Sequence, residues 1–445
     1  MQSFSLIRPQ RCRRAILALA ALLLSCGCSQ PEDETASVCT APPAPVVEEA
    51  ELPVAQERFA SQLEALLEEL QTLRPPALLD ALMAVENDAD FELRLKHWED
   101  RHFSARRLQA EALAWQLMEV TELDFDYPAS ILAMLPQPMP FFYDDGAHEL
   151  VVRQSWLEAG GELRLAVREL VYALQHRIFG LDDLTPTRAG KQGPGPLGDD
   201  HKLAWMAVVQ GDALGIWAQL EKQAPTSDDP QSVDAWLAAL RGIITQSEPM
   251  RRFPPMLQEL LLFPELEGFR YTHRARALQP EHWREQVYQN MPRSTQAVLY
   301  ASQSPAPNRV ALDVQAFQQE GDSLVYENSL GALGWRAWLR QLHCGETTGC
   351  AELDELAQHW RADRLYVWSG LQGERAALLA DWADAHQAER VASLLRTQAQ
   401  RSSRCWLVEA QESQVLVLIA QGAACPNWPT GARLFEAARQ LDGCW

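Results

Sequence analysis

Apolar residues recur at helical spacing along most of the chain between residues 56 and 300. A proline pair ends the first of these segments at Arg74-Pro75-Pro76, because the residue before a proline disfavours the helical conformation. A long helix is predicted from about Leu93 to Val120. The apolar positions of the first helix are Phe59, Leu63, Leu66, Leu67 and Leu70.

A second amphipathic helix is predicted from Glu162 to Phe179, after an Asp-Gly turn and a strand at Glu149–Arg153. A Gly- and Pro-rich loop follows, and Asp199-Asp200 predicts the cap of a helix from about His201 to Lys222. Beyond Gln223 the pattern is helical to about residue 301. The apolar stripe of the Glu162–Phe179 helix comprises Leu163, Val167, Leu170, Val171, Leu174 and Ile178.

The last third of the chain mixes strand and helix patterns. Asp363-Arg364, at the start of one strand, is expected to form an internal salt bridge. The chain is therefore predicted to be α+β and predominantly helical, with a helical domain at 56–300 and a C-terminal α+β subdomain at 301–445 packed on it. The expected strands are Arg364–Trp368, Ala376–Leu379 and a hairpin of Trp406–Glu409 with Val415–Ile419, and the expected helices are Asp384–Thr397 and Gly431–Leu441.

The N-terminus carries an export signal. Arg8, Arg11, Arg13 and Arg14 precede a short apolar run, Ala15–Leu24, which is typical of a secretory signal peptide and too short for a membrane span. The run ends in Leu-Leu-Ser-Cys-Gly-Cys, which resembles the lipobox of bacterial lipoproteins. Lipidation is expected at Cys26, with Cys28 as the alternative, and an ordinary cleaved signal with incidental cysteines stays open.

These assignments give a signal peptide at 1–25 and an acidic, Pro-rich tether at 26–55, which cannot bury enough apolar surface to fold. The lipid is expected to hold the protein in the membrane. No Asp follows either candidate cysteine, and by resemblance to lipoprotein sorting this implies the outer membrane, with periplasmic and surface exposure both open.

The formal net charge of −21 argues against a nucleic-acid partner and against a folded surface that lies on anionic lipid. In an exported chain, Cys344 and Cys350 bracket a short Gly-containing loop that suits a local disulfide. The remaining C-terminal cysteines supply at most one more bridge and leave one thiol, for which Cys39 is a possible partner; these are Cys405, Cys425 and Cys444.

The segment Arg168-Glu169-Leu170-Val171-Tyr172 has the form of a zinc-peptidase helix without its ligands. Such a helix carries His-Glu-x-x-His, because residues four apart share one face and can bind one metal, and the Glu activates the metal-bound water. Glu169 is present, but an Arg and a Tyr hold the histidine positions. A guanidinium has no lone pair to give a metal.

Residues 168–181, RELVYALQHRIFGL, resemble a family of zincin-like bacterial and archaeal proteins with the motif His-Glu-Leu-Thr-His-Ala-Leu-Gln-Asp-Gln-His-Phe-Asp-Leu. Residues 208–213 resemble its Ala-Leu-x-Glu-Gly-Asp-Ala segment, and Gln210 stands where the family has its presumed third ligand, a Glu. Residues 263–269 resemble its Phe-Pro-Tyr-x-x-Gly segment. Residues 141–153, 292–299 and 360–364 resemble further segments in the family's order.

The resemblance implies a zincin-like helical core, and the departures imply no bound metal and no peptidase activity. All three ligand positions are changed, to Arg168, Tyr172 and Gln210. At ~4 Å and an effective dielectric constant of 20, a guanidinium repels a dication by roughly 8 kcal/mol. Arg168 is expected to pair instead with an acid such as Asp212 or Asp200.

The function expected from this pattern is a lipid-anchored, catalytically inactive protein that keeps a binding or scaffold role in the cell envelope. It would use a cleft near Glu169, Tyr172 and Gln210 for an unidentified protein or peptide partner, and no cofactor is expected. The alternative is an active envelope hydrolase or peptidase with unusual metal ligands, or with Glu169 as general base.

Overall fold

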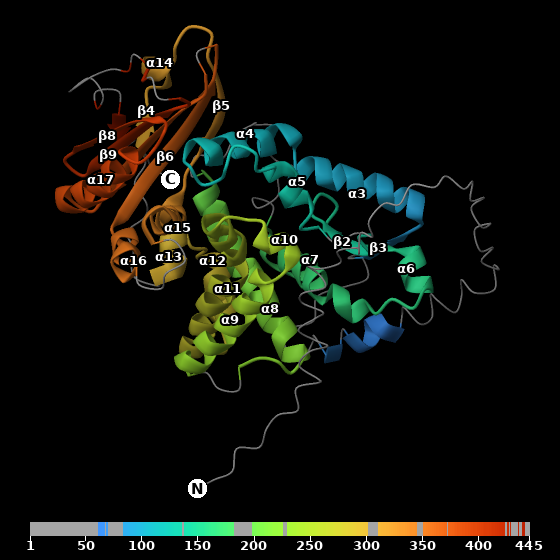
Figure 1. Cartoon of the computed structure of the whole chain (residues 1–445). Coiled ribbons are helices and arrows are strands. Elements are labelled where there is room, and N and C mark those ends of the chain that lie inside the picture. The colour runs from blue at the N-terminus through green and yellow to red at the C-terminus, as the bar shows by residue number, and fades with distance from the viewer. Residues whose placement is uncertain are drawn as a thin grey trace, which may run out of the picture.

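The structure is a computed structural model that describes residues 61–66, 68–69, 83–135, 138–181, 198–225, 229–300, 310–344, 350–371 and 373–422, and a few positions between 425 and 440 (Figure 1). The signal peptide, the tether and Cys26, Cys28, Cys39 and Cys444 lie outside these residues. The described chain is a mixed α+β fold, as predicted. None of its helices is both long and apolar enough to cross a membrane.

A small sheet and three helices form the first part of the described chain. The strand order is β1-β3-β2, with β1 parallel and β2 antiparallel to β3. The predicted strand at Glu149–Arg153 is confirmed as β3. The single helix expected from Leu93 to Val120 is wrong: it divides at residues 103–104 into two helices. The elements are β1 (Met83–Glu86), α3 (Asp88–His102), α4 (Ala105–Leu117), α5 (Tyr127–Leu132), β2 (Phe141–Asp144) and β3 (Glu149–Arg153).

A helical layer follows, and α8 and α11 form its centre (Figure 1). The helix predicted from Glu162 begins as a 3-10 turn and becomes α-helical at Val167. The helix predicted from His201 begins earlier, so Asp199 and Asp200 lie in its first turn. The elements are α6 (Gln154–Glu158), η1 (Leu163–Ala166), α7 (Val167–Phe179), α8 (Gly198–Leu220), α9 (Pro230–Thr245), α10 (Glu248–Arg251), α11 (Pro255–Leu278), α12 (Trp283–Gln289) and α13 (Thr295–Tyr300).

Helices α8 and α11 touch backbone to backbone. A Cβ atom placed on Gly211 would lie 2.1 Å from the carbonyl carbon of Gly268, and one on Gly268 would lie 2.0 Å from the carbonyl oxygen of Ala207. Both distances are far below van der Waals contact, so only glycine permits this approach. The two glycines therefore fix the level at which α8 passes α11.

The C-terminal part contains a five-stranded antiparallel sheet of order β5-β6-β7-β9-β8. The hairpin predicted at 406–419 is confirmed as β8 and β9. The helix predicted at Gly431–Leu441 is wrong for residues 438–440, which form strand β10 (Ala438–Gln440) against β4 (Val310–Leu312). The remaining elements are α14 (Val314–Phe317), β5 (Ser323–Asn328), α15 (Gly331–Cys344), α16 (Ala351–Gln358), β6 (Trp360–Ser369), β7 (Arg375–Trp382), α17 (Ala385–Ala399), β8 (Cys405–Gln411) and β9 (Gln414–Ala420).

Both faces of this sheet are covered. Every residue of β7 is buried, and α17 packs against one face while β4 lies against the other (Figure 1). Helix α15 packs on α11 and carries the fully buried Trp335 and Trp338. The indole nitrogen of Trp338 donates to the carbonyl of Met118, 3.0 Å away, so the apolar core runs without interruption between the two parts.

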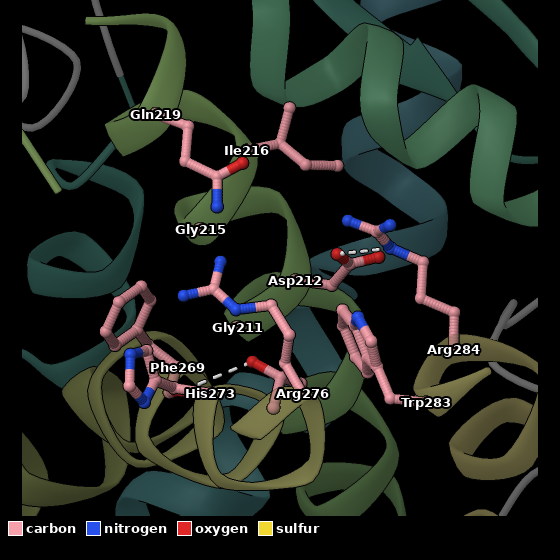
Figure 2. Close-up of a pocket in the computed structure, with 11 residues that line it drawn as sticks. Gly211, Asp212, Gly215, Ile216, Gln219, Phe269, His273, Arg276, Trp283 and Arg284 are labelled. Carbon is pink, nitrogen blue, oxygen red and sulfur yellow. Dashed lines mark hydrogen bonds and ion pairs between the residues drawn. The ribbon is translucent and has the colours of Figure 1, made fainter. Parts of the chain in front are cut away.

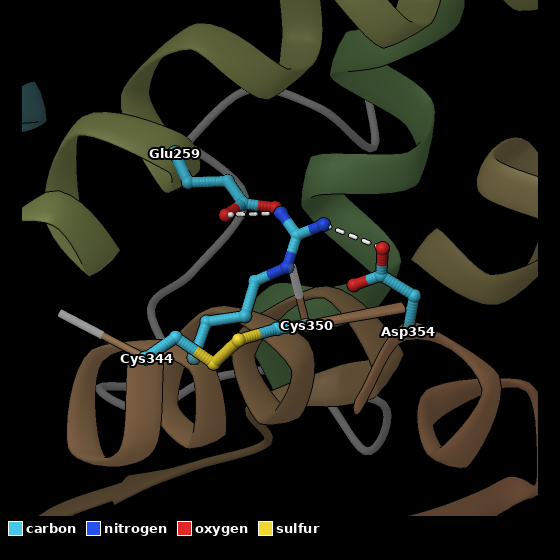
Figure 3. The surroundings of a disulfide bond; sticks show 5 residues. Glu259, Cys344, Cys350 and Asp354 are labelled. Carbon is cyan, nitrogen blue, oxygen red and sulfur yellow. Dashed lines mark hydrogen bonds and ion pairs between the residues drawn. A yellow bond between two sulfur atoms is a disulfide. The ribbon is translucent and has the colours of Figure 1, made fainter. Parts of the chain in front are cut away.

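Two cysteine pairs lie at disulfide distance. Cys344 and Cys350, with Cα atoms 6.4 Å apart, join the end of α15 to the start of α16, as predicted. The second pair is Cys405 with Cys425, with Cα atoms 5.2 Å apart. Beside the first bridge, Arg340 of α15 contacts Asp354 of α16 at 2.5 Å and Glu259 of α11 at 3.5 Å, so ion pairs link three helices there (Figure 3).

Candidate functional site

Helix α7 carries the altered motif. Its apolar stripe is buried as predicted except at Ile178, which is 43% exposed. Each step of four residues turns an α-helix about 40° beyond a full turn. Two such steps from Leu170 therefore carry Ile178 off the buried face. Gly180, with φ of 63°, ends the helix in the left-handed conformation that suits glycine.

Arg168 forms an ion pair with Glu265 of α11. Its Nη2 lies 2.5 Å from Glu265 Oε1 and donates to the hydroxyl of Tyr172 at 3.1 Å. Only 12% of the Arg168 side chain and 17% of the Glu265 side chain are exposed. The expectation of an acidic partner is therefore correct in kind, but the two named candidates, Asp212 and Asp200, are wrong.

Asp212 of α8 is bonded to side chains of α7 and α12 and not to Arg168. Its buried carboxylate accepts hydrogen bonds from Gln175 Nε2 at 3.1 Å, Tyr288 OH at 3.2 Å and Arg284 Nε at 3.1 Å. Two neutral donors and one guanidinium already satisfy this carboxylate. The residue therefore anchors α7 and α12 to α8 rather than balancing Arg168.

Asp200 is buried in the first turn of α8. It accepts hydrogen bonds from the backbone amide and the hydroxyl of Thr295, which opens α13. Burial raises the pKa of Asp200 to about 7, with a smaller contribution from the nearby Asp363. Asp200 therefore joins two helix starts and does not reach the motif helix.

Burial and neighbouring charges shift the pKa values of the side chains around Arg168. Burial raises the pKa of Tyr172 to about 12, although the Arg168 guanidinium acts in the opposite direction. Burial also raises the pKa of Glu169, and Glu265 adds to this effect while Arg168 opposes it. At neutral pH Tyr172 is therefore a neutral phenol, which is a poor ligand for a metal ion.

Two polar atoms in this cluster are buried without a hydrogen-bond partner. They are Oε2 of Glu169, an acceptor, and Nε of Arg168, a donor. Buried polar atoms are nearly always paired with protein or with water. The cluster of Arg168, Glu169, Tyr172 and Glu265 therefore presents one unmet acceptor and one unmet donor on adjacent residues.

Gln210, the third altered position, lies on α8 directly before Gly211. It is half-buried, and within the described residues its side chain forms no hydrogen bond. Arg168 and Tyr172 are joined directly, and Gln210 is not joined to them. The structure brings two of the three altered positions together and adds Glu265, which the sequence analysis did not single out.

A signal for Glu265 was present in the sequence. In the segment that resembles Phe-Pro-Tyr-x-x-Gly, Glu265 stands at the tyrosine position. Arg168 and Glu265 thus carry opposite charges at two positions of the segments that resemble the family. In the structure these two side chains form an ion pair.

The side chains at the altered positions do not fit a zinc ion. They are a guanidinium, a neutral phenol and a carboxamide, whereas catalytic zinc uses three nitrogen, sulfur or carboxylate ligands. Among the described residues, no group of three or more His, Cys, Asp or Glu could hold a metal ion.

The expected salt bridge between Asp363 and Arg364 is replaced by two separate interactions. Asp363 accepts hydrogen bonds from the amides of Leu330 and Gly331 and thereby caps α15. Arg364 contacts Glu327 on the neighbouring strand at 3.4 Å. Successive residues of a strand point to opposite faces, so two adjacent side chains are poorly placed to pair.

Comparisons with known proteins add no information about this site. No family model matches the chain, and no curated protein and no solved structure matches it either.

Proposed function

We propose that this chain is a lipid-anchored, catalytically inactive relative of zincin-like peptidases that binds a protein or peptide partner in the cell envelope. The observation that carries the proposal is the buried ion pair between Arg168 and Glu265, with Tyr172 on the same guanidinium. This pair puts a fixed, neutralised charge at the first ligand position of the altered motif.

The ion pair supports the absence of a metal ion because the two side chains balance each other's charge without one. Arg168 remains charged at any accessible pH, and the carboxylate of Glu265 balances that charge within a largely buried site. A dication in the same place would face the guanidinium, the neutral Tyr172 hydroxyl and no imidazole. The cluster is thus suited to be stable without an ion.

A binding role accounts for the two unmet polar atoms. A peptide group offers one donor and one acceptor, which complement Oε2 of Glu169 and Nε of Arg168. Hydrogen bonds to charged groups are worth about 1.5–3 kcal/mol each. Both atoms are buried in this structure, so a partner segment would form these hydrogen bonds only after displacing the side chains that cover them.

Glu169 also supports a second candidate, a hydrolase that uses this residue as general base. Its carboxylate is buried, has an unpartnered oxygen, and has a pKa raised by burial. Groups with raised pKa values in partly buried positions are typical of general acid–base catalysis. Turnover of a peptide substrate that Glu169→Gln abolishes, with binding retained, would favour this candidate over the first.

Restoring the ligands tests the ancestry. We expect Arg168→His, Tyr172→His and Gln210→Glu, combined with Glu265→Tyr to avoid an unpaired buried acid, to create a zinc site measurable by titration calorimetry. The matched control omits only Gln210→Glu and keeps two of the three ligands. If the folded variant with all four changes binds zinc no more tightly than this control, the assignment of Gln210 is wrong.

Metal content of the purified full-length chain tests the inactive state directly. We expect far less than one zinc per chain by elemental analysis after dialysis without chelator. One tightly held zinc per chain would overturn the proposal.

A further inference from the structure

Lys202, near the start of α8, is placed differently from two acidic side chains of the same helix. Asp200 accepts hydrogen bonds from Thr295. Asp212 accepts one from Arg284 (Figure 2). The Lys202 side chain is only partly exposed, and within the part of the chain that the structure describes its amine forms no hydrogen bond and no ion pair. An ammonium group in that position lacks the carboxylate partner that usually compensates for partial burial.

Charged side chains from three parts of the fold act on this amine. Arg107 and Glu111 belong to α4, and Asp145 lies in the turn between β2 and β3. Asp199 precedes Lys202 by three residues on α8, so the two share one helix face. These four neighbours comprise three carboxylates and one guanidinium, so together they favour a positive charge at this position.

The three acids have ion-pair partners of their own, but one acceptor atom is left over. Asp199 Oδ2 accepts hydrogen bonds from Arg107 and Asn328, whereas Asp199 Oδ1 is buried without a partner. Asp199 Oδ1 and the amine of Lys202 are thus an unmet acceptor and an unmet donor on one face of α8. The ion pairs of the three acids are Arg107–Glu111, Arg107–Asp199, Arg101–Asp145 and His102–Asp145.

Burial changes the reactivity of this amine. It lowers the pKa of Lys202, and the Arg107 guanidinium lowers it further, while the three carboxylates act in the opposite direction. A lysine in such surroundings is neutral, and therefore nucleophilic, in a larger fraction of molecules than an exposed lysine. The chain has only four lysines, so this amine has few competitors; the other three are Lys96, Lys191 and Lys222.

We propose that Lys202 is a covalent site for a small, uncharged aldehyde. The amine nitrogen attacks the carbonyl carbon and forms a C–N bond, and the carbonyl oxygen leaves as water with the two amine hydrogens. This step gives an imine and needs no oxidant or reductant. The imine then takes up a proton and carries the same charge as the lysine that it replaces. Asp199 Oδ1 can accept a hydrogen bond from the protonated nitrogen.

The charges around Lys202 favour an aldehyde over other carbonyl reagents. An acyl group would leave an uncharged amide, and carbon dioxide would leave a carbamate anion. The three neighbouring carboxylates favour a cation over either product. The partial burial of the side chain favours a small reagent. This proposal does not depend on the metal ancestry of the motif helix.

The test is modification of the folded full-length chain with acetaldehyde and cyanoborohydride, which reduces each imine to a stable secondary amine that peptide mass spectrometry locates. We expect Lys202 to react several-fold faster at pH 7 than Lys96 and Lys222, which are exposed. An equal or slower rate at Lys202 would overturn the proposal. Pyridoxal 5′-phosphate, a larger and anionic aldehyde, should show no such preference, because the carboxylates repel it. The same preference with this reagent would contradict selection of a small, uncharged aldehyde.

Two variants and one solvent condition locate the effect. Lys202→Arg keeps a cation that never becomes a neutral amine, so the fast-reacting site should disappear. Lys222→Arg is the matched control and should leave the rate at Lys202 unchanged. In guanidinium chloride that unfolds the chain, Lys202 should react no faster than the other lysines. A preference that persists in the unfolded chain would refute a site built by the fold.

Discussion

Asp200 accepts two hydrogen bonds from Thr295, one from its backbone amide at 3.1 Å and one from its hydroxyl, so a single buried carboxylate joins the first turns of α8 and α13. The same hydroxyl accepts a hydrogen bond from the amide of Leu333 in α15. Three helices that are far apart in sequence thus begin at one point, and their joint stability depends on the protonation of that carboxylate.

Stability should therefore depend on pH through Asp200. Its pKa is about 7 in the folded chain against 3.8 for an exposed aspartate. Folding takes up a proton between these values, so this residue makes the fold more stable as pH falls from about 7 toward 4. The full difference corresponds to roughly 4 kcal/mol at most.

The variant Asp200→Asn isolates this effect, because the carboxamide oxygen can still accept both hydrogen bonds but never carries a charge. We expect it to match the native chain in urea denaturation at pH 5 and to be the more stable of the two at pH 8. A stability difference between the two proteins that is the same at both pH values would contradict the assignment.

The ion pair at the motif helix should show a large cost when it is broken on one side. Glu265→Gln leaves the Arg168 guanidinium in a largely buried site without its anion, and such changes cost about 3–5 kcal/mol. The double variant Arg168→Met with Glu265→Met removes both charges and should recover much of that loss. Chemical denaturation at pH 7 measures all three proteins.

An exposed glutamate provides the control for that series. Glu285 is 72% exposed and lies 3.8 Å from His282, so Glu285→Gln should change stability by no more than about 0.5 kcal/mol. Equal losses in Glu265→Gln and Glu285→Gln would mean that the Arg168–Glu265 pair contributes nothing beyond a surface contact.

The contact between α8 and α11 should tolerate no side chain at Gly211. Gly211→Ala puts a methyl group 2.1 Å from the backbone of Gly268, so the helices must separate, at a cost of about 1–3 kcal/mol or more. Gly242→Ala instead gains about 1 kcal/mol of helix propensity, since it meets nothing within 4 Å. Thermal denaturation should shift in opposite directions for the two variants.

The two disulfides should stabilise the fold to different extents. The chain between the paired cysteines is shorter for Cys344–Cys350, with a separation of 6, than for Cys405–Cys425, with a separation of 20. The loop-entropy relation gives about 2 and 3 kcal/mol for the two bridges. Paired Cys→Ser variants, compared by denaturation with the oxidised native chain, should follow this order, and the reverse order would contradict it.

The spacing of apolar residues predicted those helices and strands that bury one face or both faces. The hairpin of β8 and β9 and the helix α17 were located within a few residues, because their apolar positions repeat at the strand and helix periods. Residues 438–440 were assigned to a helix, but they pair with β4 in the structure. There the ladder with a distant strand decides the conformation, which local spacing does not report.

The candidate site was predicted in part for a similar reason. The helical period placed Arg168 and Tyr172 on one face of α7, and the hydrogen bond between them bears this out. The acid that pairs with Arg168 lies 97 residues away, on a helix whose orientation no local pattern fixes. Charge alone could not distinguish Glu265 from Asp200 or Asp212, since all three are acids on neighbouring helices.

The close passage of Gly211 and Gly268 has a consequence for how the site can change over evolution. Because main chain meets main chain there, the positions of Gln210 and Glu265 beside the crossing are set by the scaffold and not by the groups they carry. A substituted residue at either position therefore keeps the same backbone location. Chemistry at this site can thus drift by single substitutions while the architecture around it persists.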